Sequence, residues 1–402
     1  MAAATSRRGR SRVHKTWIVC VLSVLSSGIF LAQEPAGPQA ISEAQLQAAI
    51  DKLGDLDYAT RTDASRIVRR TAGAQAVPAL LRAVAEHRDG YVRYRALVLL
   101  TGFNDPRTRD AIRESLKSPN DRLRTVAFSF LERNPDRTAT PDLLRAVDTE
   151  LAEFVRPALI RALAAVGDDP RVQAVLVRET GRGEDFFRSA VIEALGDYKA
   201  SYAYEALAKV AALDGPLQDD AALALGKIGD KRALETLAGL QRTAPRTTQP
   251  TVAAAICLLG VNCDSHENYL AETLRFADAN PGFQELLRSA AAGLGALGVA
   301  GRTSAVDALF LTGIPSRDPT RAPVALAVAT VALRNTPLML SILEKRRERA
   351  AALALAAEGF DMLEEDLDKE RFFAFVRRSY WQSAEASATR DLMQTLIGKL
   401  DF

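Results

Sequence analysis

Histidine is scarce in this chain, and its scarcity limits the chemistry that the side chains can perform. Of three histidines, only His87 and His266 lie beyond residue 32, and they are far apart in the sequence. Metal sites and Ser/His/Asp triads need several such residues close together. His266-Glu267 is the one His-Glu pair, and no G-x-S-x-G nucleophile motif occurs. The sequence therefore predicts no catalytic residues, no metal site and no cofactor.

One glycine-rich stretch, GLGALG at residues 293–298, has the spacing G-x-G-x-x-G of a dinucleotide-binding loop. That motif binds pyrophosphate only where it follows a strand and opens a helix. Here the glycines close an alanine-rich helical stretch, so the helix end beside them has the wrong polarity for phosphate. We interpret the stretch as the end of a helix and predict no nucleotide site.

Two cysteines lie beyond residue 32, Cys257 in a predicted helix and Cys263 in the loop that follows. A secreted protein permits a disulfide, and a chain that turns back after Gly260 would bring the two sulfurs within bonding reach. The alternative is that Cys257 is simply a buried apolar side chain. Both interpretations are open at this point.

These residues lie within a pattern that repeats every 30 to 35 residues, a period typical of solenoids. Its best copy is LQDDAALALGKIGD at residues 217–230. The first positions of the eight copies are Thr60, Val92, Leu123, Val155, Phe187, Leu217, Thr251 and Leu286. Positions 5 and 9 are apolar in every copy, as expected of a helix that buries one stripe. We expect the glycines at position 10 to end their helices in a left-handed turn; they are Gly196, Gly226, Gly260 and Gly295.

After each such helix the chain reads G-D-x-R or a variant, as in GDKRALETLAGL at residues 229–240, and then a second amphipathic run. The pattern resembles the short bacterial HEAT repeat of the phycobilisome-lyase-like type, well over residues 58–300 and more weakly beyond. The resemblance implies an all-α superhelical solenoid of the armadillo type, with roughly ten helix pairs. It implies no activity, because that family includes scaffolds, adaptors and a few enzymes.

The N-terminal residues 1–32 are typical of a secretory signal peptide. Five basic residues and no acid precede the apolar run WIVCVLSVLSSGIFLA. We predict cleavage near Ala32 or Gln33 and a periplasmic or secreted protein; retention as a membrane anchor is the alternative. Removing this segment leaves 47 of the 52 basic residues against 50 acids, so the remainder is close to neutral. That balance argues against a nucleic-acid partner.

The rest of the chain divides into three parts by pattern. Residues 33–57 hold a linker and an N-terminal capping helix, residues 58–300 hold the HEAT-like repeats, and residues 301–402 hold degenerate repeats and C-terminal capping helices. No stretch has the alternating pattern of a strand.

Position 2 of the repeat is arginine in five consecutive copies: Arg61, Arg93, Arg124, Arg156 and Arg188. Such a ladder is a candidate site for an acidic partner. An acid precedes each arginine, however, and would cap the helix or pair with the arginine; these acids are Asp57, Asp89, Asp121, Glu153 and Asp185. We favour this structural interpretation.

Aromatic residues gather near the end of the chain, in the stretch FFAFVRRSYW at residues 372–381. We expect Phe372, Phe375 and Trp381 to belong to a helix that caps the last repeat. The alternative is that these aromatics dock a partner or a membrane surface.

The sequence as a whole predicts a secreted, non-catalytic scaffold or adaptor that binds another protein along its curved surface. The rival predictions are a lyase or isomerase built on the same fold, and a membrane-anchored factor of envelope assembly.

Overall fold

The computed structural model describes residues 34–400 and residue 402, which form one unit. The predicted signal peptide lies outside these described residues. They contain 22 α-helices, three short 3-10 helices and no strand. Their one β-type contact is an isolated bridge between Gln39 and Thr71. The prediction of an all-α solenoid is confirmed.

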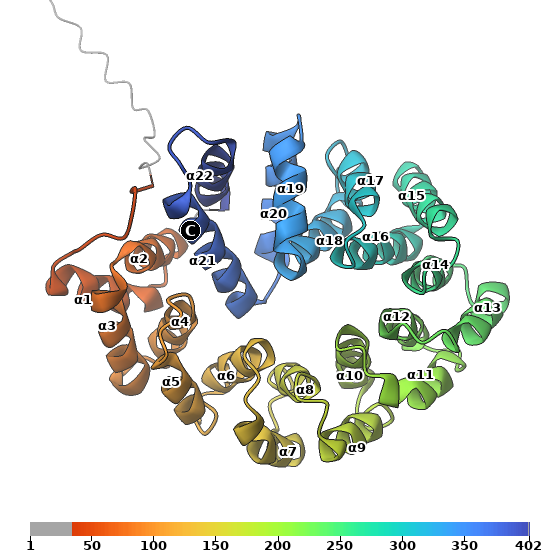
Figure 1. Cartoon of the computed structure of the whole chain (residues 1–402), viewed down its shortest axis with the longest axis horizontal. Coiled ribbons are helices and arrows are strands. Elements are labelled where there is room, and N and C mark those ends of the chain that lie inside the picture. Colours follow the sequence, from red (N-terminus) through yellow and green to blue (C-terminus); the bar gives the residue numbers. More distant parts are fainter. Residues whose placement is uncertain (1–33, 401) are drawn as a thin grey trace, which may run out of the picture. The chain divides into compact units, whose positions relative to one another are not determined.

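The first twenty helices form ten pairs, each with one helix on the inside of the curve and one on the outside (Figure 1). The outer helices are α1 (Glu43–Asp51), α3 (Gly73–Glu86), α5 (Thr108–Ser115), α7 (Thr140–Thr149), α9 (Pro170–Glu179), α11 (Tyr204–Ala211), α13 (Ala233–Thr243), α15 (Cys263–Ala279), α17 (Thr303–Gly313) and α19 (Thr336–Lys345). The inner helices are α2 (Tyr58–Arg70), α4 (Gly90–Thr101), α6 (Asp121–Arg133), α8 (Arg156–Ala164), α10 (Asp185–Asp197), α12 (Gln218–Ile228), α14 (Gln249–Leu258), α16 (Gln284–Val299), α18 (Arg321–Arg334) and α20 (Arg349–Met362).

The apolar columns of the repeat explain why the helices stack. The eight copies coincide with the inner helices α2 to α16, and every residue at positions 5 and 9 is buried. Each inner helix packs on the inner helix of the next pair, so the columns form one continuous apolar layer through the repeats. Burying a leucine or valine side chain stabilises a fold by about 1.5–3 kcal/mol, and position 9 provides one such side chain in each of the eight copies.

The predicted role of the glycines at position 10 is wrong for three of them. Gly196, Gly226 and Gly295 lie inside helices, and a Cβ atom on Gly226 would lie 2.5 Å from the Cα of Ala255 in the next inner helix. These glycines let neighbouring helices approach closely. Gly260 is the exception, because it follows α14 with a φ of 79°, the left-handed turn expected.

The last two helices close the curve into a ring. Figure 1 shows α21 (Asp366–Gln382) and α22 (Ala388–Leu400) beside the first pairs, and α21 packs against α4 and α6 as well as against α22. Leu367 of α21 is buried in the same apolar core as the residues of the early repeats. A solenoid with two separately capped ends was expected, whereas here the two ends cover each other.

We call the contact of α21 with the first helix pairs the seam. Its polar contacts join residues about 300 positions apart in the sequence. Arg69 of α2 binds Glu370 through paired hydrogen bonds of 2.7 and 2.9 Å, and both side chains are buried. Gly102 makes room for this pair, since a Cβ atom there would lie 2.9 Å from Glu370 Oε1. Tyr94 of α4 donates a hydrogen bond to Asp366.

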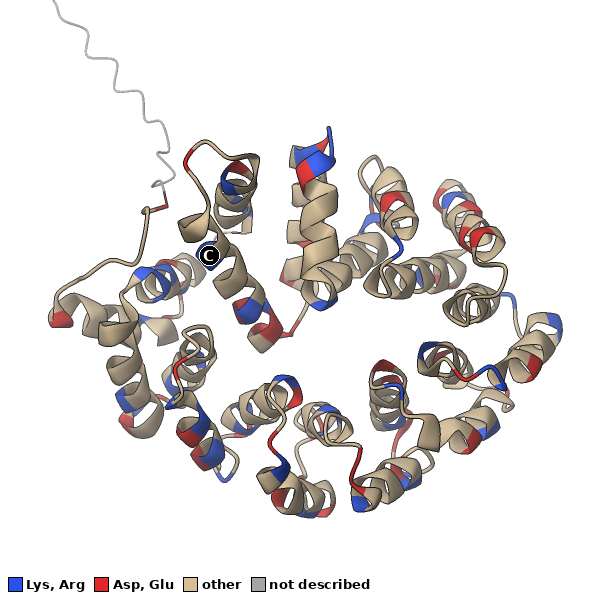
Figure 2. Ribbon diagram, viewed as in Figure 1, with Lys and Arg blue, Asp and Glu red and all other residues tan. Residues whose placement is uncertain are grey.

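Charges of both signs are interspersed along the inner and outer helices (Figure 2). Within the described residues, no single helix is long and apolar enough to cross a membrane. Helices α18 and α19 are long and apolar enough only when taken together, and the chain bends by 115° between them.

Candidate functional site

The predicted arginine ladder lies where each inner helix begins, and its side chains point back to the preceding outer helix. Arg93 donates to the carbonyl of Val84 at 2.8 Å, and Arg188 donates to the carbonyl of Thr180 at 3.0 Å. Arg61 binds two backbone carbonyls of the turn before α2. These arginines satisfy carbonyls that a helix end or turn leaves without a backbone partner.

Two ladder arginines make further contacts. Arg124 forms a two-bonded ion pair with Glu150, at 2.7 and 2.9 Å, and donates to the carbonyl of Ser118. The guanidinium of Arg156 lies 3.7 Å from the ring centre of Phe187, a cation–π contact to the next repeat. All five ladder side chains are half-buried and occupied within the protein.

The acids ahead of the ladder have several roles. Asp57 and Asp89 cap α2 and α4 by accepting backbone hydrogen bonds, and Asp185 pairs with Arg188 at 2.8 Å. Helix α6 is capped by Asn120 in place of Asp121, and Glu153 caps no helix. The structure thus places the ladder among local contacts of the helix pairs.

The C-terminal aromatics are divided between the core and the surface. Phe372 is buried against Phe360, while Phe375 is partly exposed. Trp381 is half-buried, and its Nε1 donates to the carbonyl of Pro35 at 3.0 Å. Phe372 thus packs on the preceding helix α20, whereas Trp381 contacts the N-terminal end of the described chain.

Cys257 of α14 and Cys263 at the start of α15 are joined by a disulfide. The left-handed turn at Gly260 reverses the chain between them. His266 lies three residues later in α15, whereas His87 follows α3. The described residues contain no group of three or more His, Cys, Asp or Glu side chains that could hold a metal ion.

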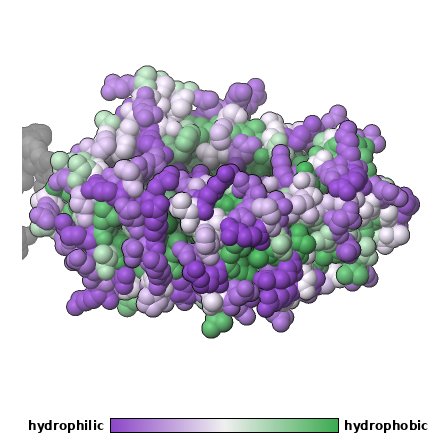
Figure 3. Space-filling model, turned by 60° about the horizontal axis from the view of Figure 1, so that its bottom comes forward, coloured by the Kyte–Doolittle hydropathy of each residue, from purple (hydrophilic) through white to green (hydrophobic). Residues whose placement is uncertain are grey.

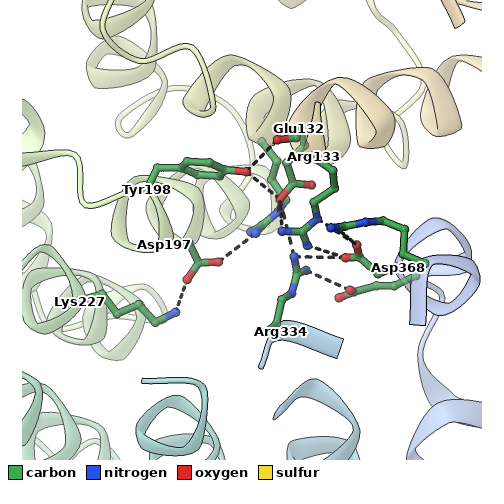
Figure 4. A network of polar contacts seen from close by, with 10 residues as sticks. Glu132, Arg133, Asp197, Tyr198, Lys227, Arg334 and Asp368 are labelled. Carbon is green, nitrogen blue, oxygen red and sulfur yellow. Dashed lines mark hydrogen bonds and ion pairs between the residues drawn. The ribbon is translucent and has the colours of Figure 1, made fainter. Parts of the chain in front are cut away.

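A network of charged side chains and one tyrosine lies on the inner side of the ring and links α6, α8, α10, α12, α18 and α21 (Figure 4). We call it the central network: Glu132, Arg133, Arg161, Asp197, Tyr198, Lys227, Arg334, Glu365, Asp368 and Arg371. Its bases come from repeats of both halves of the ring. It was not predicted, because each repeat contributes only one or two ordinary charges.

The central network has two carboxylate centres. Glu132 accepts hydrogen bonds from Arg161 at 2.9 Å and from the Tyr198 hydroxyl at 3.1 Å. Asp368 accepts two from Arg133, at 2.6 and 2.9 Å, and it also pairs with Arg334 and Arg371, each at 3.2 Å. Arg334 lies 3.6 Å from Glu132 and so links the two centres.

Burial and neighbouring charges shift the pKa values in the central network in opposite directions. Burial opposes ionisation of Asp197, but Lys227 and Arg161 outweigh it and hold the pKa of that carboxyl below its usual range. Burial raises the pKa of Glu365 to about 7, and the neighbouring carboxylate of Asp368 adds to the shift. The network thus holds a carboxyl that titrates near neutral pH, inside a set of mutually paired charges.

A second feature missed by the sequence analysis is a row of exposed apolar side chains on one edge of the ring. Leu56, Leu151 and Leu213 occupy the same repeat position, four residues before position 1, and they are 99%, 90% and 63% exposed. Phe154 and Phe186, each just before position 1, are also more than half exposed. We call these five residues the apolar edge.

Equivalent positions in stacked repeats lie side by side, so the apolar edge follows one rim of the ring through α8, α10 and α12, with Leu56 as an outlier beside α2. The space-filling view in Figure 3 shows hydrophobic patches among hydrophilic residues, with both reaching the surface. The signal in the sequence is a leucine or phenylalanine in the turn before an inner helix or, for Phe186, in the first turn of that helix.

Comparisons with known proteins agree with the repeat architecture. Residues 77–164 match the family model of HEAT repeats. The chain carries HEAT repeats, and its helix pairs continue on both sides of the matched segment. No curated protein matches the chain.

Two solved structures illustrate the breadth of similar folds. The CpcE–CpcF complex of phycocyanin lyase from Nostoc sp. PCC7120 is 19% identical, with a TM-score of 0.27, over 81% of this chain and 96% of that one. Kap121p bound to RanGTP is 15% identical, with a TM-score of 0.34, over 88% of this chain and 45% of that one. The chain spans about half the length of Kap121p. Similarities this weak carry no argument about function.

Proposed function

We propose that the protein is a secreted, non-catalytic HEAT-repeat scaffold that binds another protein through its apolar edge. The observation that carries this proposal is the recurrence of exposed leucine and phenylalanine side chains along one rim. Leu151 and Leu213 are largely exposed although a polar residue would serve equally well in a turn. Exposed apolar side chains that recur along one rim are candidates for an interaction site.

The interior of the ring is less suited to a partner than the curved surface of an open solenoid. Helix α21 covers α4 and α6, and the central network pairs its charges with one another. A partner bound there would have to replace buried ion pairs, whose disruption costs several kcal/mol. A partner bound at the rim would leave these ion pairs intact.

Capture from the native cell envelope tests the proposal. Residues 34–402 carrying Leu151→Ser, Phe154→Ser and Phe186→Ser should fold normally, because these side chains are exposed, and should lose a partner that the unchanged protein captures. The control is Met362→Ser, an exposed apolar residue at the C-terminal end of α20. Equal capture by both variants would disprove a role for the apolar edge.

Secretion is a separate part of the proposal and rests on residues 1–32. Mass spectrometry of the protein recovered from the native envelope should give an N-terminus near Gln33. Recovery of the intact N-terminus in the membrane fraction would favour the anchored alternative.

A further inference from the structure

A cavity of about 570 Å³ opens beside α21 at the seam. Its walls come from the turn between α4 and α5 with the start of α5, from α6, from the junction of α18 and α19, and from α21. Segments from both ends of the ring therefore build it. Pockets of 300–1,000 Å³ are typical of small-molecule sites.

The acids that line this cavity are already neutralised. Asp105 binds Arg107 through two hydrogen bonds of 2.9 Å, and this contact lowers the pKa of Asp105 to about 2. Asp368 is shared by Arg133, Arg334 and Arg371. Arg133 and Arg334 also pair with Glu132, so their charges are balanced within the central network, and of the three arginines only Arg371 lines the cavity.

Two further arginines line the cavity without an acid. Among the described residues, no carboxylate forms an ion pair with Arg109 or Arg378. Arg109 is exposed, and Arg378 is half-buried with a hydrogen bond to the carbonyl of Gly102 at 3.0 Å. Burial lowers the pKa of Arg378 with no anion to oppose the shift, although the group stays charged at neutral pH. The cavity therefore holds cations that lack a counter-charge.

Apolar side chains provide the remaining walls. Phe130, Leu333 and Phe372 line the cavity, and Phe375 lies at its edge, 41% exposed. A cavity with apolar walls and a few charged groups binds ligands that combine an apolar body with a matching charge. Guanidinium groups bind carboxylates with paired hydrogen bonds.

We propose that this seam cavity binds a small organic anion, a carboxylate attached to an apolar group, with Arg109 and Arg378 holding the carboxylate and Phe130 and Phe375 contacting the apolar part. The site is independent of the apolar edge. Because its walls come from both ends of the ring, an occupied cavity also holds the ring closed.

Calorimetric titration of residues 34–402 with 4-phenylbutyrate, and with its uncharged amide as the matched probe, tests the proposal. The carboxylate should bind saturably and the amide at least about tenfold more weakly, since the amide lacks the negative charge that a guanidinium group binds. Binding should weaken as salt rises, because Arg109 is exposed.

Arg109→Gln is the cleanest variant, since this exposed side chain makes no ion pair whose loss would unfold the protein. This variant should bind 4-phenylbutyrate about tenfold more weakly and should bind the amide as the unchanged protein does. Arg378→Gln should do the same. The control is Arg88→Gln, an exposed arginine outside the cavity, which should bind as the unchanged protein does.

Three outcomes would overturn the proposal: no binding of 4-phenylbutyrate, equal affinity for the acid and the amide, or equal affinity in the Arg109 and Arg88 variants. An acidic peptide that binds while 4-phenylbutyrate does not would replace it with a peptide site. Partner capture by the apolar edge is measured separately, so failure of either idea leaves the other standing.

Discussion

The guanidinium of Arg377 joins three parts of the chain at one buried point. It is only 2% exposed, donates to Glu34 at 3.0 Å, and donates to the carbonyl of Phe402 at 2.6 Å. Burial lowers the pKa of Arg377 to about 10, and Glu34 opposes that shift. Removing one partner of such a pair costs about 3–5 kcal/mol, because a buried charge is left alone. Single side chains at the seam thus matter more than their counterparts on the helix surfaces.

The close approach of the inner helices predicts opposite effects for two glycine substitutions. Gly226→Ala places a Cβ atom against the backbone of Ala255 and should destabilise the protein by about 1–3 kcal/mol. Gly239→Ala, in the outer helix α13 with open space around it, should stabilise by about 0.5–1 kcal/mol. Urea unfolding of both variants measures the difference. A stabilised Gly226→Ala would mean that the inner helices are farther apart than described.

Glu365 should make stability depend on pH. The pKa of this carboxyl is raised above the ordinary value of 4.5 to about 7, so the folded state holds its proton more tightly than the unfolded state does. The sign follows from linkage: stability is full below about pH 4.5 and falls as pH rises toward 7. Glu365→Gln should remove this decline. Melting curves from pH 5 to 8 measure it, and parallel pH profiles for the two proteins would contradict the assignment.

At the scale of the element, the same structural need is met by different residues around the ring. The turn from an outer to an inner helix leaves carbonyls without partners, and a long donor at the start of the inner helix satisfies them. Arg321 donates to the carbonyl of Gly313, Arg349 to that of Leu343, and Gln249 to that of Ala244. The ladder of five arginines is thus part of a longer series.

This series predicts a moderate cost for removing one donor. Arg124→Met keeps the helix propensity but breaks the bonds to Glu150 and to the carbonyl of Ser118, and should lower stability by about 1–2 kcal/mol. Arg145→Met removes an exposed pair with Asp142 and should change stability by less than about 0.5 kcal/mol. Denaturant midpoints for the two variants check this. Equal midpoints would refute the carbonyl-binding role.

The elements show why some predictions from sequence succeeded. Positions 5 and 9 recur with a fixed period, so the register, the inner helices and the buried columns could all be read from the pattern. The glycines were misread because a helix end and a close helix contact both favour glycine. The local sequence around Gly226 does not separate the two, since the neighbour it contacts, Ala255, belongs to another repeat.

At the scale of the whole molecule, the ring is the feature that the sequence did not predict. Closure depends on a small rotation between successive pairs, summed over ten pairs, and on contacts such as that between Arg69 and Glu370. No local pattern encodes either. The central network and the seam cavity were missed for the same reason, because both are assembled from distant repeats.

Removing the closing helices should therefore change the shape of the protein. A chain ending at residue 363 lacks α21 and α22, exposes Phe360 and the inner face of α4, and should melt at a lower temperature and scatter as a more extended particle. Small-angle X-ray scattering measures the change. The double variant Arg69→Met, Glu370→Met keeps the helices and should retain the compact ring, because apolar residues of similar size can replace a buried pair. An unchanged radius for the truncated chain would argue that the repeats hold their curvature without the seam.

The bridge made by Arg377 also determines how the protein would respond to a mechanical load. In an open solenoid, tension applied to the two ends passes through every repeat in series and stretches the array like a spring. Here one guanidinium holds both Glu34 and Phe402, so tension applied at these two residues acts first on the seam. The repeats carry no load until the seam breaks. A single-molecule pulling trace should therefore begin with one early rupture that releases little chain length, followed by the unravelling of helix pairs.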